Sequence, residues 1–200
     1  MQNKADMIEN NTNKAIQAID EKNISQLENI KEIMNKMKED FEILRVSLYI
    51  DSLTKVYNRK WIDDNIVNDD LFKLEGSLVF IDLNDFKQIN DIQGHIIGDK
   101  VLFTLSTILK KELDKDNFNF NIVRYGGDEF IIFFKETNLI SIKRELDKIK
   151  HKIETTKLKS SKSTFNISFS YGLTYFKENE SFKNVIEIAD KKMYQNKKKR

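Results

Sequence analysis

The sequence predicts an α+β domain with a central, mostly antiparallel sheet flanked by helices, preceded by an N-terminal helical segment. Three observations predict this fold. From about residue 49 to residue 200 the chain alternates strand, helix, hairpin, helix, strand and helix patterns. Apolar, β-branched and aromatic runs flank Gly126-Gly127, as in a β-hairpin. Residues 1–48 contain no glycine and no strand pattern. We therefore expect two parts, 1–48 and 49–200, with the helices of the second packed on one face of its sheet.

The N-terminal part carries a heptad pattern. Apolar residues recur at alternating spacings of three and four, the seam of a coiled coil; they are Leu27, Ile30, Met34, Met37, Phe41, Leu44 and Leu48. The pattern predicts a strong helix from about Ser25. Asp20 and Asn23 interrupt the seam upstream, where we expect a weaker helix or a frayed arm. Two interpretations stay open: the helix pairs with a second copy of the chain in a homodimer, or it packs back on its own domain.

The second part begins at Asp51-Ser52-Leu53-Thr54, where we expect the long helix to end. Asp51 or Thr54 is expected to cap the next, short helix. Ser77–Ile81 is a continuous apolar run typical of a strand buried on both faces.

The remaining elements follow from apolar periodicity. A short helical turn is expected over Asp85–Asn90, and a longer amphipathic helix from Gly98. The hairpin comes next, followed by an amphipathic helix over 139–153. The pattern over residues 164–176 predicts one strand, or two strands with a kink at Gly172. A last helix ends in four basic residues.

Composition limits the classes of function. The 200 residues are 40% hydrophobic and 33% charged, which suits one globular domain plus an appendage. The net charge of +2 gives no support for a nucleic-acid-binding surface. The absence of cysteine excludes disulfides and thiolate metal sites. No apolar run approaches the ~20 residues that span a bilayer, and the polar N-terminus does not resemble a signal peptide, so we expect a cytoplasmic protein.

Acidic residues at the ends of two predicted strands indicate a candidate metal-binding site. Asp128 and Glu129 directly follow Gly126-Gly127, where glycine permits a positive φ and lets a phosphate approach bare backbone. Asp82 lies where the first strand emerges and is expected to face these acids across a neighbouring strand. Such carboxylates repel each other unless a cation such as Mg²⁺ binds them, often with substrate phosphates. The pattern indicates a two-metal nucleotidyl-transfer site; the alternative is a solvated Gly-Gly-Asp turn.

The segment that contains Asp128 and Glu129 also resembles a known family motif. Gly126-Gly127-Asp128-Glu129-Phe130 is the name-giving motif of the GGDEF family, the diguanylate cyclases, and further family blocks appear in order at 51–59, 82–99, 168–172 and 189–197. The resemblance covers about Asp51 to the C-terminus. It implies a palm-like, ferredoxin-like fold and the condensation of two GTP molecules into cyclic di-GMP and two pyrophosphates across a homodimer. The alternative is a catalytically silent module that binds GTP or a partner and signals through its helix. No upstream regulator is indicated.

The resemblance also implies the ligands of two Mg²⁺ or Mn²⁺ ions. They are Asp82, Asp128 and the main-chain carbonyl of Leu83. For Glu129 two roles stay open, a ligand of the second metal or the base that assists the attacking 3′-hydroxyl, because metals can lower a hydroxyl pKa without such a base.

Other residues match the family's substrate contacts. The triphosphate would meet the backbone at the glycines and at a helix N-terminus, together with two lysines; these residues are Gly126, Gly127, Asp85, Phe86, Lys87 and Lys197. For Lys197 a solubilising basic tail is the alternative. Asn90 and Asp99 match the guanine-reading pair. A carboxylate accepts from guanine N1–H and its 2-amino group but faces a lone pair on adenine N1. The alternative for Asp99 is a helix N-cap.

The chain departs from the family pattern at three places. Asn84 stands where an acid is common, and we expect it to modulate the site. Lys55 and Tyr57 replace a glycine and a proline, which is expected to alter hinge stiffness only. Asn117-Phe118-Asn119-Phe120 replaces the Arg-x-x-Asp of many members, which binds the product. Asparagine cannot form the bidentate hydrogen bonds to a phosphate that arginine forms, so we expect no product-inhibition site.

Overall fold

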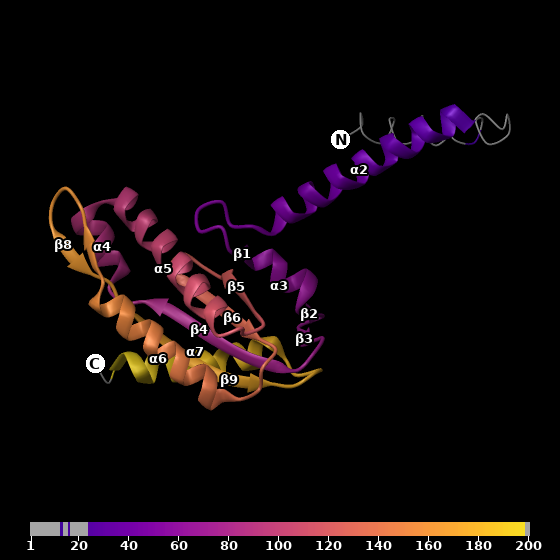
Figure 1. Ribbon diagram of the computed structural model, residues 1–200. Coiled ribbons are helices and arrows are strands. Elements are labelled where there is room, and N and C mark those ends of the chain that lie inside the picture. The colour runs from indigo at the N-terminus through magenta and orange to yellow at the C-terminus, as the bar shows by residue number, and fades with distance from the viewer. Residues whose placement is uncertain (1–12, 14–15, 17–23, 199–200) are drawn as a thin grey trace. The chain divides into compact units, whose positions relative to one another are not determined.

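The computed structural model describes residues 13, 16 and 24–198 (Figure 1). The chain divides into two compact units, 1–48 and 49–200. The weaker helix or frayed arm expected around Asp20 and Asn23 lies outside the described residues. Among those that are described, no helix combines the length and hydropathy needed to cross a bilayer.

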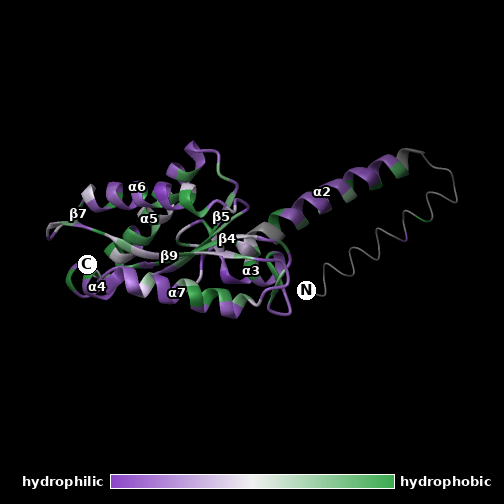
Figure 2. Cartoon of the chain, turned by 90° about the horizontal axis from the view of Figure 1, so that it is seen from below, coloured by the Kyte–Doolittle hydropathy of each residue, from purple (hydrophilic) through white to green (hydrophobic). Residues whose placement is uncertain are grey.

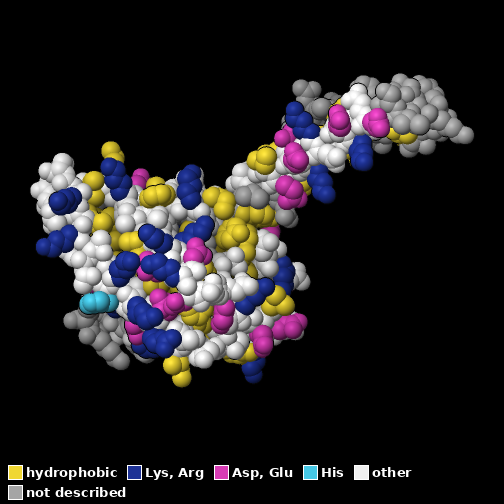
Figure 3. Space-filling view, viewed as in Figure 1, with side chains coloured by type: hydrophobic (Ala, Val, Ile, Leu, Met, Phe, Trp, Pro, Cys, Tyr) yellow, Lys and Arg dark blue, Asp and Glu magenta, His cyan; other side chains and the backbone are white. Residues whose placement is uncertain are grey.

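The N-terminal unit contains α2, a continuous helix over Ile24–Tyr49. Its heptad residues Met34, Phe41 and Leu48 are 60%, 66% and 57% exposed. Charged side chains of both signs lie along the same helix (Figure 3). The expected single helix from about Ser25 is confirmed.

The second unit is built on a five-stranded sheet with the order β1-β5-β6-β4-β9. The strands are β1 (Tyr57–Asn58), β4 (Gly76–Leu83), β5 (Phe120–Arg124), β6 (Glu129–Phe134) and β9 (Phe169–Phe176). Only the short β1 runs parallel to its neighbour β5, and the other pairs are antiparallel. The mostly antiparallel sheet and the hairpin around Gly126-Gly127 are therefore confirmed.

The described residues of this unit form five helices: α3 (Arg59–Asn65), α4 (Phe86–Gln93), α5 (His95–Lys115), α6 (Leu139–Thr155) and α7 (Phe182–Lys198). Two small hairpins stand apart from the main sheet: β2 (Val67–Asn68) with β3 (Leu71–Phe72), and β7 (Lys157–Lys159) with β8 (Thr164–Asn166). Strands this short carry too weak a pattern to be predicted from sequence.

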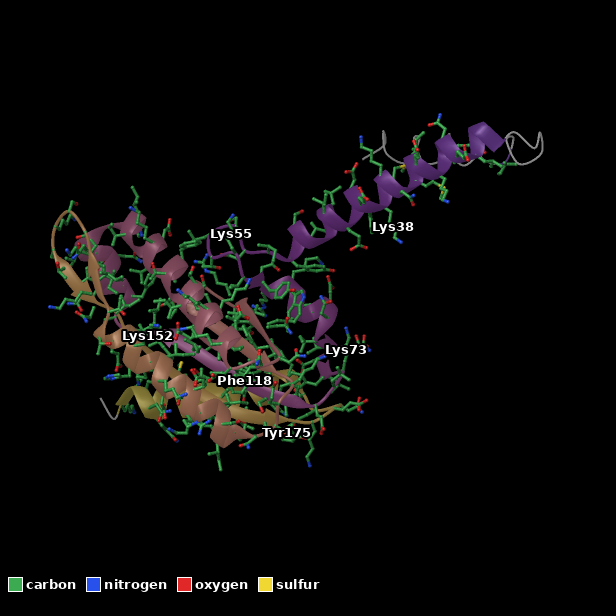
Figure 4. All side chains as sticks on the ribbon, in the orientation of Figure 1. Lys38, Lys55, Lys73, Phe118, Lys152 and Tyr175 are labelled. Carbon is green, nitrogen blue, oxygen red and sulfur yellow. The ribbon has the colours of Figure 1, made fainter. Side chains whose placement is uncertain are left out.

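Helices cover both faces of the sheet, so the expectation of one covered face was wrong. Alternate residues of β4 enter different cores: Val79 and Ile81 pack with α5 and α6, whereas Leu78 and Phe80 pack with α3 and α7. Figure 2 shows α5 and α6 on one side of the strands and α7 on the other. Lys152 of α6, labelled in Figure 4, also donates to Glu112 of α5 at 3.0 Å. Both faces of β4 are therefore buried, as its continuous apolar run predicted.

Several predicted boundaries were wrong. The long helix after β4 begins at His95, not Gly98. The 164–176 segment breaks between Asn166 and Phe169, and Gly172 lies inside β9. A Cβ on Gly172 would come within 1.8 Å of a backbone oxygen of α7, so this glycine allows close helix packing instead of a kink. Asn58 caps α3 by accepting from Trp61 N–H at 3.3 Å.

Candidate active site

The register of β4 and β6 brings the predicted acids together. Asp82 is the cross-strand partner of Glu129. The N–H of Leu83 donates to the carbonyl of Asp128 at 3.3 Å. Four predicted metal-site residues therefore meet where β4 ends and β6 begins, although 46 positions separate Asp82 from Asp128 in the chain.

Burial and mutual repulsion disturb these carboxylates. Burial raises the pKa of Asp128 and the charge of Asp82 raises it further, against the opposing effect of Lys197 and Arg124. Burial likewise raises the pKa of Glu129, together with the charges of Asp128, Asp82 and Asp190. The protein thus holds several acids where their ionised forms are unfavourable without added positive charge.

The donor set fits a hard divalent cation. Among the described residues, no three His, Cys, Asp or Glu side chains form a ready metal cage. Asp82, Asp128 and the Leu83 carbonyl supply oxygen donors, the type that Mg²⁺ takes and commonly completes with substrate phosphates. The Nζ of Lys197 contacts Oδ2 of Asp82, which places one positive charge at the acids.

The two glycines of the turn differ in their surroundings. The carboxylate of Glu129 folds over Gly126, where a Cβ would lie 2.5 Å from Oε2. Apart from its chain neighbours, nothing lies within 4 Å of a Cβ built on Gly127, so that side of the turn has open space. Neither uses the positive φ considered from sequence, which among described glycines occurs at Gly94 alone.

The remaining predicted phosphate contacts lie at the start of α4, directly after β4. Asp85 has a left-handed backbone, with φ 56°, and precedes the helix without a side-chain capping bond. Phe86 is half-buried and Lys87 is exposed on the first turn. Lys197 lies on α7 and contacts Asp82.

The predicted guanine-reading pair is brought together across the α4–α5 junction. A Cβ on Gly98 would lie 1.9 Å from Oδ1 of Asn90, so the Asn90 side chain lies over the backbone of α5 beside Asp99. Asp99 lies inside α5, whose N-cap is Gly94. The capping alternative for Asp99 is therefore wrong, and its carboxylate is exposed.

Asn84 is buried, at 4% exposure, behind the acidic cluster. Its amide nitrogen donates to Ser168 Oγ at 2.9 Å, and its oxygen accepts from Ser170 Oγ at 2.9 Å. Ser170 is also the cross-strand partner of Asp82. This neutral network satisfies every side-chain polar group that Asn84 buries and joins the ends of β4 and β9.

Sequence reasoning missed an arginine that braces the glycine turn. Arg124 donates from Nε and Nη2 to the Gly127 carbonyl at 3.1 and 2.8 Å, and from Nη1 to Asp51 at 3.2 Å. Asp51 also accepts from the N–H and hydroxyl of Thr54. Asp51 was expected to cap a helix, and instead it ties the junction at 51–54 to the turn that carries the acids. Arg124 next to the motif was the only available signal.

Arg124→Ala is expected to lower turnover about 10- to 100-fold, because the turn that orients Asp128 loses its brace. Unfolding free energy should fall by about 1–2 kcal/mol through the lost hydrogen bonds. Arg124→Lys should restore little of the lost turnover or stability, since an ammonium group lacks the planar set of donors that binds Gly127 and Asp51 together. Thermal unfolding and product formation measure both effects, with exposed Arg144→Ala as the matched control. Unchanged turnover in Arg124→Ala would contradict a positioning role.

The same variant has an expected pH dependence. Burial opposes ionisation of Asp51, but hydrogen bonds from Thr54 and the charge of Arg124 outweigh it and lower its pKa. Because the pKa of Asp51 is lower in the folded protein than in the unfolded chain, its ionised form stabilises the fold at pH values above the unfolded pKa of about 4. This stabilisation is lost as the pH falls through the pKa of the folded state. The stability difference between parent and Arg124→Ala should therefore shrink as pH falls below about 4.

Asp190 of α7 is a second residue that sequence reasoning left without a role. It adds to the repulsion that raises the pKa of Glu129, which places it near that carboxylate. The sequence marked it only as part of the closing block at 189–197. Its charge is brought to the site by the packing of α7 on β9, which no local pattern predicts.

Comparisons with known proteins agree with this geometry. The family model described as "Diguanylate cyclase, GGDEF domain" matches residues 48–200. Diguanylate cyclase DosC of Escherichia coli (strain K12) is 31% identical over 171 residues, covering 82% of this chain and 36% of the relative. Diguanylate cyclase DgcP of Pseudomonas aeruginosa is 29% identical over 194 residues, covering 91% and 28%. The chain thus spans about a third of the length of these curated relatives.

A solved structure is similar to most of the chain. The coiled coil and GGDEF domain of DgcB from Caulobacter crescentus, in complex with c-di-GMP, matches with a TM-score of 0.71 at 25% identity, covering 87% of this chain and 93% of that chain. The family model covers most of the present chain and includes every acid of the site. The chain therefore belongs to the GGDEF family of diguanylate cyclases.

Proposed function

We propose that this chain is an active diguanylate cyclase. The observation that carries the proposal is the convergence of Asp82, Asp128 and Glu129 at the adjoining ends of β4 and β6. A family member that had lost catalysis would be expected to lose one of these acids, and all are present. Activity of the whole protein rests on the same inference, because the chain matches only part of its relatives' length.

In the proposed reaction each of two chains holds one GTP, in antiparallel half-sites. The 3′-hydroxyl oxygen of each GTP gives up its proton and forms a bond to the α-phosphorus of the other, and the bond between that phosphorus and pyrophosphate breaks. Two such steps give cyclic di-GMP and two pyrophosphates. No side chain forms a covalent bond to substrate, so positioning and charge neutralisation supply the rate.

Asp82, Asp128 and the Leu83 carbonyl would hold Mg²⁺ or Mn²⁺, two per active site, with Glu129 available to the second ion. When bound, such ions neutralise phosphate charge and lower the pKa of an attacking hydroxyl. Gly127 leaves room for phosphate oxygens at the turn.

The phosphate and base contacts come from elements beside the acids. Lys87 and the N–H groups of Asp85 and Phe86 would contact the triphosphate at the start of α4. Lys197 would move from Asp82 toward phosphate oxygens once a cation neutralises that carboxylate. Asn90 and Asp99 would read guanine: the exposed Asp99 carboxylate would accept from its N1–H and from one hydrogen of its 2-amino group, and the Asn90 amide oxygen would accept from the other.

The direct test is to incubate purified protein with GTP and Mg²⁺ and identify products by chromatography and mass spectrometry. We expect cyclic di-GMP and two pyrophosphates for each product molecule, no product without divalent cation, and no product from ATP. Asp128→Asn is the matched inactive control. GTP binding without turnover, in protein shown to be dimeric, would instead support the silent-module alternative.

Product control gives a separate prediction. Asn117 and Phe120 stand at the ends of the segment where many members bind product, and Phe118 packs edge-on against Phe134. Lys55 and Phe118, labelled in Figure 4, help to line a cavity of about 580 Å³ there. Added cyclic di-GMP is expected to give no noncompetitive inhibition, because Asn117 and Phe120 cannot bind phosphate and guanine as Arg and Asp do. Initial rates at several GTP concentrations check this. Tight product binding to Asp128→Asn that GTP does not displace would contradict it.

A further inference from the structure

The helix that carries the proposed phosphate and base contacts is weakly anchored. α4 is eight residues long and contains no buried residue. It begins after Asp85 without a side-chain cap and ends at Gly94, whose φ of 90° separates it from α5. A helix of this length does not persist by itself, so contacts with its neighbours must set its position.

One side of α4 borders a cavity. A hollow of about 710 Å³ lies between α4, α6 and β8. Its walls include Gln88 and Ile89 of α4, Lys150 of α6 and Phe165 of β8. Only Phe86 and Ile89 of α4 pack against the main core. Beyond Ile89, the C-terminal half of α4 has little apolar support, and Asn90 itself rests against Gly98 of α5.

The β7–β8 hairpin supplies that support through three hydrogen bonds at its tip. Gln93 donates from Nε2 to Ser163 Oγ at 2.8 Å and accepts at Oε1 from Ser160 Oγ at 2.8 Å. Lys162 Nζ donates to the carbonyl of Ile92 at 2.7 Å. These bonds hold the last turn of α4, two and three residues from Asn90.

The hairpin is itself anchored away from α4. Leu158 and Phe165 pack against the core, and Asn166 donates from Nδ2 to the Glu154 carbonyl of α6 at 2.7 Å. Within the tip, the Ser160 hydroxyl accepts from the N–H groups of residues 162 and 163. A continuous set of contacts thus runs from α6 through the hairpin to the end of α4.

We propose that the β7–β8 hairpin tip is a clamp that positions Asn90 for base recognition by holding Gln93 and Ile92. The inference rests on the proposed function, because it assigns a base to Asn90. The clamp lies beyond the phosphate-facing first turn, so its loss should weaken reading of the base more than binding of the triphosphate. Gln93 and Ser163 are positioning residues, since neither touches substrate.

The test compares two nucleotides that share a triphosphate and differ only in the base. Calorimetry with Mg²⁺ measures binding of 3′-deoxy-GTP and 3′-deoxy-ITP, which lack the attacking hydroxyl; hypoxanthine also lacks the 2-amino group. The preference for guanine should fall about three- to tenfold in Gln93→Ala, the factor that one hydrogen bond carries. Ser163→Ala should lower the preference for guanine by a smaller factor. In the double variant the preference should fall by no more than the product of the two single factors. Gln88 is an exposed glutamine of the same helix with no hydrogen bond to the hairpin, so the control variant Gln88→Ala should keep the parent's preference for guanine.

Each outcome decides the inference. Equal loss of affinity for both nucleotides in Gln93→Ala and Ser163→Ala would show a merely structural contact and overturn it. An unchanged preference in folded variants would overturn it as well. Parent protein that binds neither nucleotide would contradict the proposed function and the clamp with it. Parent protein that prefers guanine but makes no cyclic di-GMP would contradict the proposed activity while leaving the clamp to stand on its variants.

Discussion

Asp128→Asn and Asp82→Asn are each expected to abolish cyclic di-GMP synthesis. Turnover should fall about 1,000-fold or more, because the carboxylates that hold the divalent cations supply several kcal/mol of charge stabilisation. Glu129→Gln should also reduce turnover, and restored activity at raised Mn²⁺ concentration would favour a metal ligand over a base. A coupled pyrophosphate assay measures all three.

These variants should remain folded. The pKa of Asp128 is raised by burial and by Asp82, so ionising this carboxyl group costs more free energy in the folded protein than in the unfolded chain. Asp128→Asn removes that repulsion and should keep or raise the thermal unfolding midpoint. Asp63→Asn, an exposed acid of α3, is the matched control. Near-parent synthesis in either Asp82→Asn or Asp128→Asn would show that the ligand assignment is wrong.

Disruption of the α2 seam is expected to give a folded monomer with little activity. One catalytic domain holds half of the proposed site, so pairing must supply the other half by raising its local concentration. Met34, Phe41 and Leu48 of the seam are largely exposed on the single helix. Glu at both Ile30 and Met37 puts charge into the seam, and turnover at low micromolar protein should fall about 100-fold or more.

The control for this prediction adds the same charge elsewhere on the helix. Asn29→Glu with Asn35→Glu lies off the seam and should leave a dimer with parent activity. Light scattering beside a turnover assay measures assembly and rate together. A parallel pair is expected, because Lys31 and Lys38 would face like charges in an antiparallel one. A monomeric seam variant that still cyclises GTP at the parent's rate would exclude pairing through α2.

Much of the fold and of the site could be predicted because the signals were local. The apolar run at Ser77–Ile81 predicted a doubly buried strand, and β4 is one. The glycine pair between β-branched runs predicted the β5–β6 hairpin. Asp82, Asp128 and Glu129 were predicted to converge, since antiparallel neighbours place a strand's end beside its partner's start. The heptad pattern likewise predicted α2 as one helix.

The failures share a physical cause, because each depended on what lies opposite a residue in space. Gly172 was expected to kink a strand, but it accommodates the backbone of α7. Asp51 has the chemistry of a helix cap, but Arg124, 73 positions away, lies within reach and pairs with it. Short strands and hairpin tips such as Ser160–Ser163 carry no periodicity from which their docking on α4 could be inferred.

The sequence by itself determined the family, the order of the elements and the residues that carry the proposed chemistry, because motif spacing and side-chain alternation are properties of the chain. Only the tertiary structure decided that helices cover both faces of the sheet and that Arg124 braces the glycine turn. It also decided that a hairpin tip holds the helix of Asn90 over a cavity. Long-range packing and hydrogen bonding select such contacts among partners that are each locally acceptable, so no stretch of sequence determines them alone.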